Sequence, residues 1–262
     1  MQNVRWNRGG SLAVLKIGGS VLRSLDAYRR CAEALERRLA GAPDERLIVV
    51  VSARYGVTNR LARLADALAP EPDAGIRDLL WSTGETNSVA LLTLALHRRG
   101  VEAEGLSVHE CGLRIDSGGD VHLEAQVLWS HLAARRVVVV PGFFALGANL
   151  RIVSLGRGGS DLTAVAVAAG VGAARCELIK DVGGYFSADP RCDATAAPIQ
   201  ELSYTEALAR ADAGCPVVQR EALALAARHG VVVRIGALDG CGAGTTIRAG
   251  DAACPQWAGS AA

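Results

Sequence analysis

L-A-V-L-K-I-G-G-S, at residues 12–20, is the stretch that decides the fold. Its apolar start predicts a buried strand over 12–16, and two glycines and a serine follow closely. The next segment, Leu25 to Leu39, places apolar side chains at helical spacing among arginines and glutamates. The chain therefore opens with a strand, a glycine loop and a helix, which together form the basic unit of an α/β protein.

The same unit recurs along the chain. Further buried strands are predicted at Leu47 to Val51, Val137 to Val140, Glu177 to Asp181 and Val231 to Ile235. Helices are predicted up to Leu68 and over 76–99, 123–135, 161–170, 204–212 and 220–229, several of them closed by Gly100, Gly170 or Gly230. Strands that alternate with helices favour a mainly parallel sheet covered on both faces. We therefore expect an α/β protein, a three-layer αβα sandwich.

The composition limits the classes of function. The chain has 262 residues, half of them apolar, which is enough for a large core. Its 28 basic and 27 acidic residues nearly cancel, which argues against a nucleic-acid binder or a membrane-surface protein. No apolar run is long enough to span a membrane, and residues 1–10 do not resemble a secretory signal. We expect a cytoplasmic protein with a small-molecule partner.

The seven cysteines are odd in number and lie far apart, with no C-x-x-C pair. This pattern argues against a disulfide framework and against a zinc site. We therefore expect a reducing compartment and no metal-binding residues of the protein's own.

Ligands of parallel α/β folds bind beyond the carboxyl ends of the strands, so the loops at those ends are candidate sites. In the first loop, Gly18 and Gly19 allow backbone N–H groups to approach phosphate oxygens, and Lys16 supplies a fixed positive charge beside Ser20. The spacings of the P-loop and of the dinucleotide fingerprint are both absent. By itself, a strand followed by two glycines can also be no more than a tight turn.

G-R-G-G-S-D, at residues 156–161, is the second candidate loop. Ser160 or Asp161 is predicted to cap the helix that follows. Capping by Ser160 or Asp161 leaves Arg157 unexplained. An arginine among glycines can surround a carboxylate or a phosphate with both its guanidinium and the backbone, which would explain it.

Residues 180–191, K-D-V-G-G-Y-F-S-A-D-P-R, form the third candidate loop. Two aspartates, two cations and two aromatic residues follow the end of a predicted strand, and an aromatic side chain there could flank a base ring. The alternative is a solvated surface turn.

S-T-G-E, at residues 82–85, is the fourth candidate. We interpret Ser82 or Thr83 as the N-cap of an apolar helix and Glu85 as an acid in its first turn. Ser52 and Ala53, after the second strand, would by themselves pass as an ordinary turn.

Taken together and in order, these motifs resemble the signatures of the amino acid kinase family, and in particular of its aspartokinase branch. The resemblance covers residues 12–247. The element G-R-G-G-S-D is its most specific part, because it separates aspartokinases from uridylate, N-acetylglutamate and carbamate kinases. The matching stretches are V-L-K-I-G-G-S (14–20), S-A (52–53), G-V-T-N (56–59), S-T-G-E (82–85), P-G-F (141–143), S-L-G-R-G-G-S-D-L-T-A (154–164), D-V-G-G (181–184), S-A-D-P-R (187–191) and L-S-Y-T-E-A (202–207).

The resemblance implies the amino acid kinase fold as a single domain over 1–262, with a substrate lobe at about 11–150 and a nucleotide lobe at about 151–248. It implies an ATP-dependent kinase of amino-acid biosynthesis that converts the side-chain carboxylate of aspartate, or of a related amino acid, to an acyl phosphate. Mg²⁺ would be carried on the nucleotide phosphates. The chain ends before the regulatory (ACT) domains that aspartokinases usually carry, and a homodimer or higher homo-oligomer is expected.

The resemblance also implies roles for individual residues. Lys16 and the amides of Gly18 and Gly19 would stabilise the moving phosphoryl group, and Asp161 would hold the substrate ammonium. Substrate contacts are implied for Ser52, Glu85, Arg157, Ser160 and Phe143, with Arg157 on the α-carboxylate. Nucleotide contacts are implied for Lys16, Gly18, Gly19, Ser20, Lys180, Asp181, Phe186, Asp189 and Arg191. A carboxylate acceptor needs no general base, so charge neutralisation and alignment are sufficient for catalysis.

Several positions depart from the family pattern. Pro216 stands where a lysine usually reaches the nucleotide phosphates, and Gln219 replaces a histidine. Lys180 replaces a common threonine, and we hypothesise that it restores the lost charge. Arg54 and Tyr55 differ from the usual serine-rich run, so the acceptor need not be aspartate. Two alternatives follow: a kinase for a hydroxyl or phosphonate acceptor, or a non-catalytic member that binds a nucleotide or oxyanion.

Overall fold

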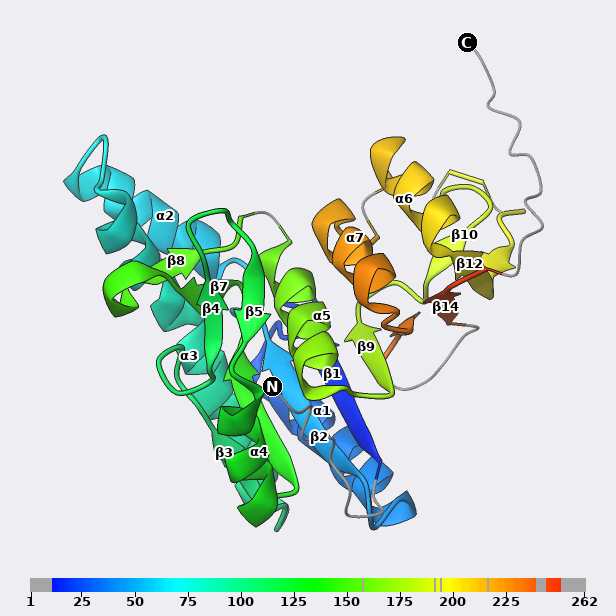
Figure 1. Ribbon diagram of the computed structural model, residues 1–262, viewed down its shortest axis with the longest axis horizontal. Coiled ribbons are helices and arrows are strands. Elements are labelled where there is room, and N and C mark those ends of the chain that lie inside the picture. Colours follow the sequence, from blue (N-terminus) through cyan, green and yellow to red (C-terminus); the bar gives the residue numbers. More distant parts are fainter. Residues whose placement is uncertain are drawn as a thin grey trace.

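The computed structural model describes residues 11–156, 158–190, 192–193, 195–215, 217–238 and 244–250. An eight-stranded sheet runs through both halves of this part of the chain (Figure 1). Its strands, in order across the sheet, are β12 (Glu201–Ser203), β14 (Thr245–Arg248), β13 (Val233–Gly236), β9 (Arg175–Ile179), β1 (Leu12–Ile17), β2 (Arg46–Val51), β6 (Val137–Pro141) and β3 (Ala103–Gly105). Neighbouring strands run parallel except for β13 and β14. The predicted mainly parallel sheet is confirmed.

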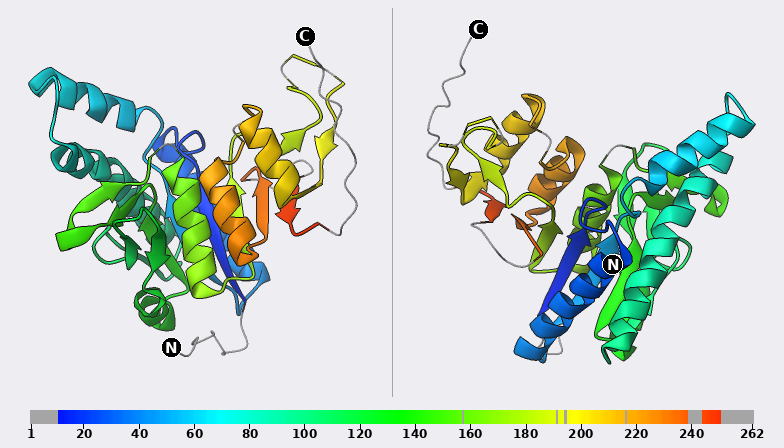
Figure 2. Two further views of the ribbon diagram at one scale, coloured as in Figure 1. Left: turned by 45° about the horizontal axis from the view of Figure 1, so that its top comes forward. Right: turned by 180° about the vertical axis from the view of Figure 1, so that it is seen from behind.

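Helices cover both faces of this sheet (Figure 2). One layer contains α1 (Leu25–Gly41) and α3 (Ala74–Arg98), with α2 (Val57–Leu68) packed against α3. The other contains α4 (Ala125–Ala134), α5 (Gly159–Val171), α6 (Tyr204–Asp212) and α7 (Arg220–His229). This arrangement is the expected three-layer sandwich.

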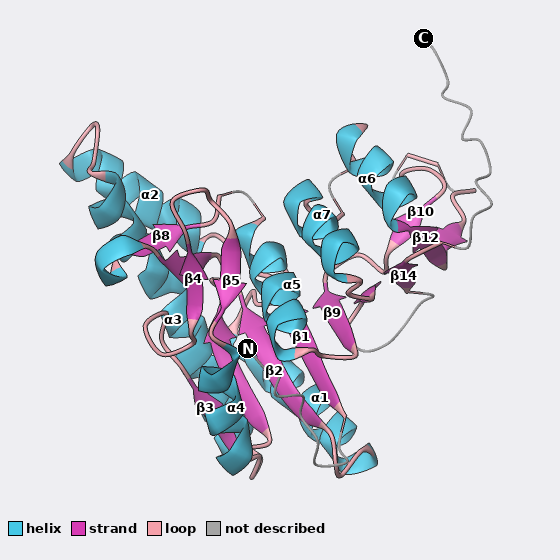
Figure 3. Cartoon of the chain, viewed as in Figure 1, coloured by secondary structure: helices cyan, strands magenta, loops and turns pink. Residues whose placement is uncertain are grey.

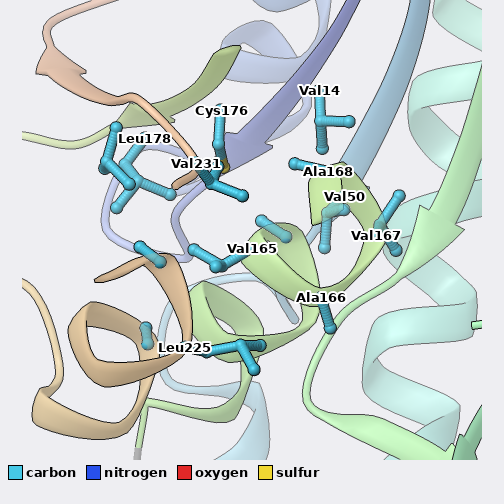
Figure 4. Close-up of a cluster of buried hydrophobic side chains, with 14 of the residues drawn as sticks. Val14, Val50, Val165, Ala166, Val167, Ala168, Cys176, Leu178, Leu225 and Val231 are labelled. Atoms are coloured by element: carbon cyan, nitrogen blue, oxygen red, sulfur yellow. The ribbon is translucent and has the colours of Figure 1, made fainter. Parts of the chain in front are cut away.

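The alternation of side chains along the central strands explains the two layers. Val14, Ile48 and Val50 point to one face, where they join the core formed with α4, α5 and α7. Figure 4 shows Val165 and Ala168 of α5 within this core. The intervening strand residues, such as Leu15 and Val49, join a second core under α1 and α3. Because both faces are covered, the strands read as continuous apolar runs.

A smaller four-stranded sheet was not predicted. It contains β5 (Val121–Leu123), β4 (Leu113–Ile115), β7 (Phe144–Leu146) and β8 (Ile152–Ser154), with the 3₁₀ helix η1 (Ala148–Leu150) between the last two (Figure 3). A hairpin of β10 (Tyr185–Phe186) and β11 (Pro198–Ile199) was also missed. Strands of two or three residues carry too little alternation to be detected.

The S-T-G-E segment lies within α3, so its prediction as a helix start is wrong. The helix begins at Ala74, where the Asp73 carboxylate accepts the N–H of Ile76 at 3.0 Å. Ser82 Oγ instead donates to the Leu79 carbonyl oxygen of the preceding turn. No proline interrupts the segment, and the helix continues through Gly84, where an added Cβ would lie 3.1 Å from the Cβ of Ala53.

The predicted ends of α5 are also wrong. Its N-cap is Gly158, which has a φ of 74° and makes no side-chain capping bond, and Asp161 lies inside the first turn. At the other end Gly170 is helical, and Gly172, with a φ of 66°, closes the helix.

None of the helices in the described ranges is long and apolar enough to cross a membrane. The large sheet takes strands from both halves of the chain, and the division into a substrate lobe and a nucleotide lobe stays a prediction.

Candidate active site

Two lysines meet on one buried carboxylate at the carboxyl edge of the large sheet. Lys16, near the end of β1, places its Nζ 2.9 Å from Oδ1 of Asp161, and Lys180, just after β9, places its Nζ 2.7 Å from Oδ2. The strands β1 and β9 are neighbours, which brings the two lysines together. Asp161 is only 3% exposed and lies in the first turn of α5. We call Lys16, Asp161 and Lys180 the two-lysine cluster.

The electrostatics of this cluster favour an added anion. Burial alone would raise the pKa of Asp161, but the two lysines outweigh it and lower that pKa, so the carboxylate is ionised. Burial and the nearby Lys16 lower the pKa of Lys180, although Asp161 opposes them. With both lysines protonated, the two ammonium charges exceed the single carboxylate charge of Asp161, so the cluster is positively charged.

The two residues are also the only lysines of the chain, and its other permanently cationic side chains are all arginines. An ammonium is a compact point charge, whereas a guanidinium is a broad planar fork. Lys16 and Lys180 therefore present point charges at this site, whereas elsewhere in the chain Arg38 and Arg175 meet on the buried Glu45.

The glycine loop lies beside the cluster. The Gly18 N–H donates to the carbonyl oxygen of Ile179 at 3.1 Å, so it is already used. Within the described residues, the N–H groups of Gly19 and Ser20 donate to no acceptor. A Cβ on Gly19 would lie 2.6 Å from the Ala53 carbonyl oxygen, so only glycine fits there. Two of the amides in this loop are therefore free to meet a phosphate.

Asp181 contacts the last residue of this loop. Ser20 Oγ donates to Asp181 Oδ1 at 2.9 Å, and an Arg23 nitrogen lies 3.8 Å from Oδ2. The Asp181 side chain is 52% exposed, unlike that of Asp161.

A pocket of about 360 Å³ opens next to the glycine loop. We call it the Glu85 pocket. It includes four residues predicted to bind substrate, Ser52, Glu85, Phe143 and Ser160. Its lining consists of Gly19, Ser20, Ser52, Ala53, Arg54, Tyr55, Gly56, Thr58, Asn59, Glu85, Phe143 and Ser160.

Glu85 is the buried acid of this pocket. It is 3% exposed, its Oε1 accepts the Ala53 N–H at 3.2 Å, and its Oε2 has no hydrogen-bond partner. Burial raises the pKa of Glu85 to about 7, because no cation lies close enough to offset the desolvation of the carboxylate. The side chain therefore has an oxygen available for a cationic ligand.

Phe143 forms one wall of the pocket in a constrained conformation. Its φ is 73°, its N–H donates to Thr163 Oγ1 at 3.1 Å, and its carbonyl accepts the Leu155 N–H at 2.8 Å. Residues of α5 and of the loop after β8 thus hold its backbone in place.

Other predicted residues are placed elsewhere or lie outside the described ranges. Phe186 belongs to β10 and Asp189 to the loop between β10 and β11, and neither lines the Glu85 pocket. Arg157, Arg191 and Pro216 fall outside the described residues. Arg54 lines the pocket, although sequence reasoning gave it no role. Its departure from a serine-rich run was the signal that could have identified it.

The chain belongs to the amino acid kinase family, whose model matches residues 11–237. Among curated proteins, it is 35% identical over 229 residues to the aspartate kinase Ask_LysC of Stutzerimonas stutzeri strain A1501. That match covers 86% of this chain and 55% of the relative, so the chain spans about half the length of such relatives.

Solved structures agree in fold. The aspartate kinase from Synechocystis matches with a TM-score of 0.83 and 33% identity, covering 92% of this chain and 40% of that one. The aspartokinase III of E. coli, solved with aspartate and ADP, matches with a TM-score of 0.75 and 25% identity, covering 91% of this chain and 65% of that one.

Proposed function

We propose that the chain is an ATP-dependent kinase that phosphorylates the side-chain carboxylate of aspartate or a closely related amino acid. The observation that carries this proposal is the position of the two-lysine cluster beside the Glu85 pocket. Gly19 and Ser20 belong to the loop after Lys16 and also line the pocket, and Ser160 lines it next to Asp161. A phosphoryl group held over the loop would therefore face an acceptor in the pocket. The relatives and the complex of E. coli aspartokinase III with aspartate and ADP support this assignment.

In the proposed reaction a carboxylate oxygen of the acceptor attacks the γ-phosphorus of ATP. The new P–O bond forms as the bond to the β–γ bridging oxygen breaks, and ADP leaves. A carboxylate is ionised at neutral pH, so no proton has to be removed. Lys16 and the free amides of Gly19 and Ser20 stabilise the negative charge that spreads over the transferring group.

Asp161 acts in this proposal as the residue that positions both lysines. The resemblance implied that it holds the substrate ammonium, but each of its oxygens already faces a lysine. Glu85 is better suited to that role, because its Oε2 is unpaired at the pocket. Ser52, Ser160 and Phe143 shape the pocket, and the expected contact of Arg157 with the α-carboxylate stays a prediction.

The nucleotide is proposed to lie over Lys180 and Asp181, with Phe186 and Asp189 along its path, and the implied contact of Arg191 stays a prediction. No group of three or more metal-ligating side chains occurs among the described residues. The side chains fit a magnesium ion that arrives with the nucleotide, because Asp181 offers a half-exposed carboxylate beside the glycine loop. When bound, Mg²⁺ supplies neutralisation of the phosphate charge.

The finer expectations also belong to this proposal. Synthesis of an acyl phosphate from ATP fits cytoplasmic amino-acid biosynthesis. A homodimer is supported by three large apolar side chains that are exposed on α3, Ile76, Leu79 and Leu94. Light scattering on the purified chain measures this oligomeric state directly.

Hydroxylamine trapping tests the proposed function, because it converts an acyl phosphate to a coloured hydroxamate. The purified chain is given ATP, Mg²⁺ and either aspartate, glutamate, N-acetylglutamate or 2-aminoadipate. We expect a signal with aspartate or a close relative that disappears in Lys16→Ala. Nucleotide binding without hydroxamate from any acceptor would favour a hydroxyl or phosphonate acceptor, and no nucleotide binding would favour a non-catalytic role.

A further inference from the structure

Arg54 is a cation without a counter-charge in the Glu85 pocket. Its side chain is partly buried and lines the pocket. It forms no ion pair and no hydrogen bond with any residue that the structure describes. By contrast Arg38, which is also partly buried, is paired with both Glu45 and Glu177. None of the Arg54 nitrogens is among the buried atoms without a partner, so its guanidinium is open to the pocket and free to bind an anionic ligand.

Glu85 does not provide that anion, although it lines the same pocket. Its Oε1 is engaged by the Ala53 N–H, and no ion pair joins it to Arg54. Both charges act on the phenol of Tyr28, whose pKa is raised mainly by burial, lowered by Arg54 and raised by Glu85. The pocket thus offers a separate cation and a separate acid close to the same buried phenol.

A dipolar ligand with an additional carboxylate matches this arrangement. Its ammonium would meet Oε2 of Glu85, and its reacting carboxylate would lie at the amides of Gly19 and Ser20. One further carboxylate then remains, and a guanidinium binds a carboxylate through two parallel hydrogen bonds.

We propose that Arg54 binds the carboxylate of the acceptor that is not phosphorylated, and that it thereby selects amino acids with two carboxylates. This inference rests on the proposed function and adds to the role implied for Arg157. Arg54 is a substrate-binding residue in this proposal, since it takes no part in the transfer of the phosphoryl group.

A thermodynamic cycle that combines one substitution in the protein with one change in the substrate tests the proposal. Wild type and Arg54→Met are compared on aspartate and on its α-amide, which keeps the side-chain carboxylate and the ammonium. For aspartate, we expect Arg54→Met to lower kcat/KM about 100-fold, mainly by raising KM. Replacing aspartate by the amide should lower the kcat/KM of wild type at least about tenfold more than it lowers the kcat/KM of Arg54→Met.

Two variants separate this contact from a loss of charge or of folding. Arg63→Met removes the same charge from the exposed face of α2 and should leave KM for aspartate unchanged. Arg54→Lys keeps the charge without the planar fork and should recover only part of the loss. Equal losses on the amide in wild type and in Arg54→Met would overturn the proposal, as would an unchanged KM in Arg54→Met.

Calorimetric binding of aspartate without ATP keeps the inference distinct from the proposed function. If wild type binds aspartate but transfers no phosphoryl group, the proposed function fails, and the inference stands only if Arg54→Met loses that binding. If wild type turns over aspartate while Arg54→Met behaves identically, the inference alone fails. A wild type that binds no dicarboxylic amino acid contradicts both.

Discussion

Lys180 Nζ lies 2.7 Å from Oδ2 of Asp161, on the carboxylate oxygen opposite to the one that Lys16 approaches. Lys180 is thus part of the same buried charge cluster as the lysine of the glycine loop. The sequence suggested that Lys180 restores a charge lost at Pro216, and this hypothesis stays a prediction, because Pro216 lies outside the described residues. A single carboxylate fixes both cations, so their separation is set by the protein before the nucleotide binds.

Removal of Lys180 should weaken the use of ATP. We expect Lys180→Met to lower kcat/KM for ATP about 30-fold, because a charged hydrogen bond contributes about 2 kcal/mol. Arg220→Met removes the same charge from an exposed ion pair with Asp212 and should leave kcat/KM nearly unchanged. Normal ATP affinity in Lys180→Met, measured by nucleotide titration, would rule out the charge-restoring role.

Asp161→Asn should reduce stability as well as activity. The change leaves two largely buried ammonium groups facing each other without a carboxylate, which costs about 3 kcal/mol. Urea unfolding measures this loss. Adding Lys180→Met to Asp161→Asn should recover part of it, because one of the unpaired charges is then gone. A further loss in the double variant would contradict the charge explanation.

Glu85 should give the folding stability a distinctive pH dependence. Burial raises the pKa of Glu85 to about 7 from an ordinary value of 4.5, so the folded state holds this proton more tightly than the unfolded chain does. The contribution of Glu85 is therefore greatest below about pH 4.5 and declines by about 3 kcal/mol as the pH rises to about 7. Subtracting the profile of Glu85→Gln from that of wild type isolates this decline. A difference that stays constant with pH would show that Glu85 titrates normally.

The same titration should appear in catalysis. If ionised Glu85 binds the acceptor ammonium, KM for the acceptor should fall as the pH rises through about 7. Glu85→Gln should have a high KM without this pH dependence.

Gly19→Ala tests the importance of the close approach between the glycine loop and the loop after β2. An added Cβ would meet the Ala53 carbonyl oxygen at 2.6 Å, and backbone on both sides must then move. We expect kcat/KM to fall at least tenfold, because the free amides of the loop shift with it. Gly41→Ala, at the end of α1 with nothing within 4 Å, should retain full activity. Equal activities in the two variants would show that the contact has no catalytic importance.

Local signals explain how much of the fold could be predicted. The helices α6 and α7 begin and end at the predicted residues, since Ser203 forms a capping box before α6 and Gly230 adopts a left-handed conformation after α7. The start of α3 was harder to place, because Ser82 and Thr83 look like capping residues while their hydroxyls bond to the preceding turn.

The site was predictable only in part, because its geometry depends on contacts between distant segments. The residues of the glycine loop and of the start of α5 could be identified from their motifs. The pairing of Lys180 with Asp161 could not, since it depends on the order of strands in the sheet. The raised pKa of Glu85 follows from the burial of this α3 residue against the loop after β2, which no local pattern reveals.

The restriction of lysine to the two-lysine cluster makes the site chemically addressable. Amine-selective acylating reagents do not modify guanidinium groups, so the only side chains they can target are Lys16 and Lys180. The lowered pKa of Lys180 increases its fraction of reactive free amine. Any label in addition to the one on the α-amino group would therefore lie on Lys16 or Lys180. A smaller mass increase in the presence of nucleotide would show that the bound nucleotide shields these lysines.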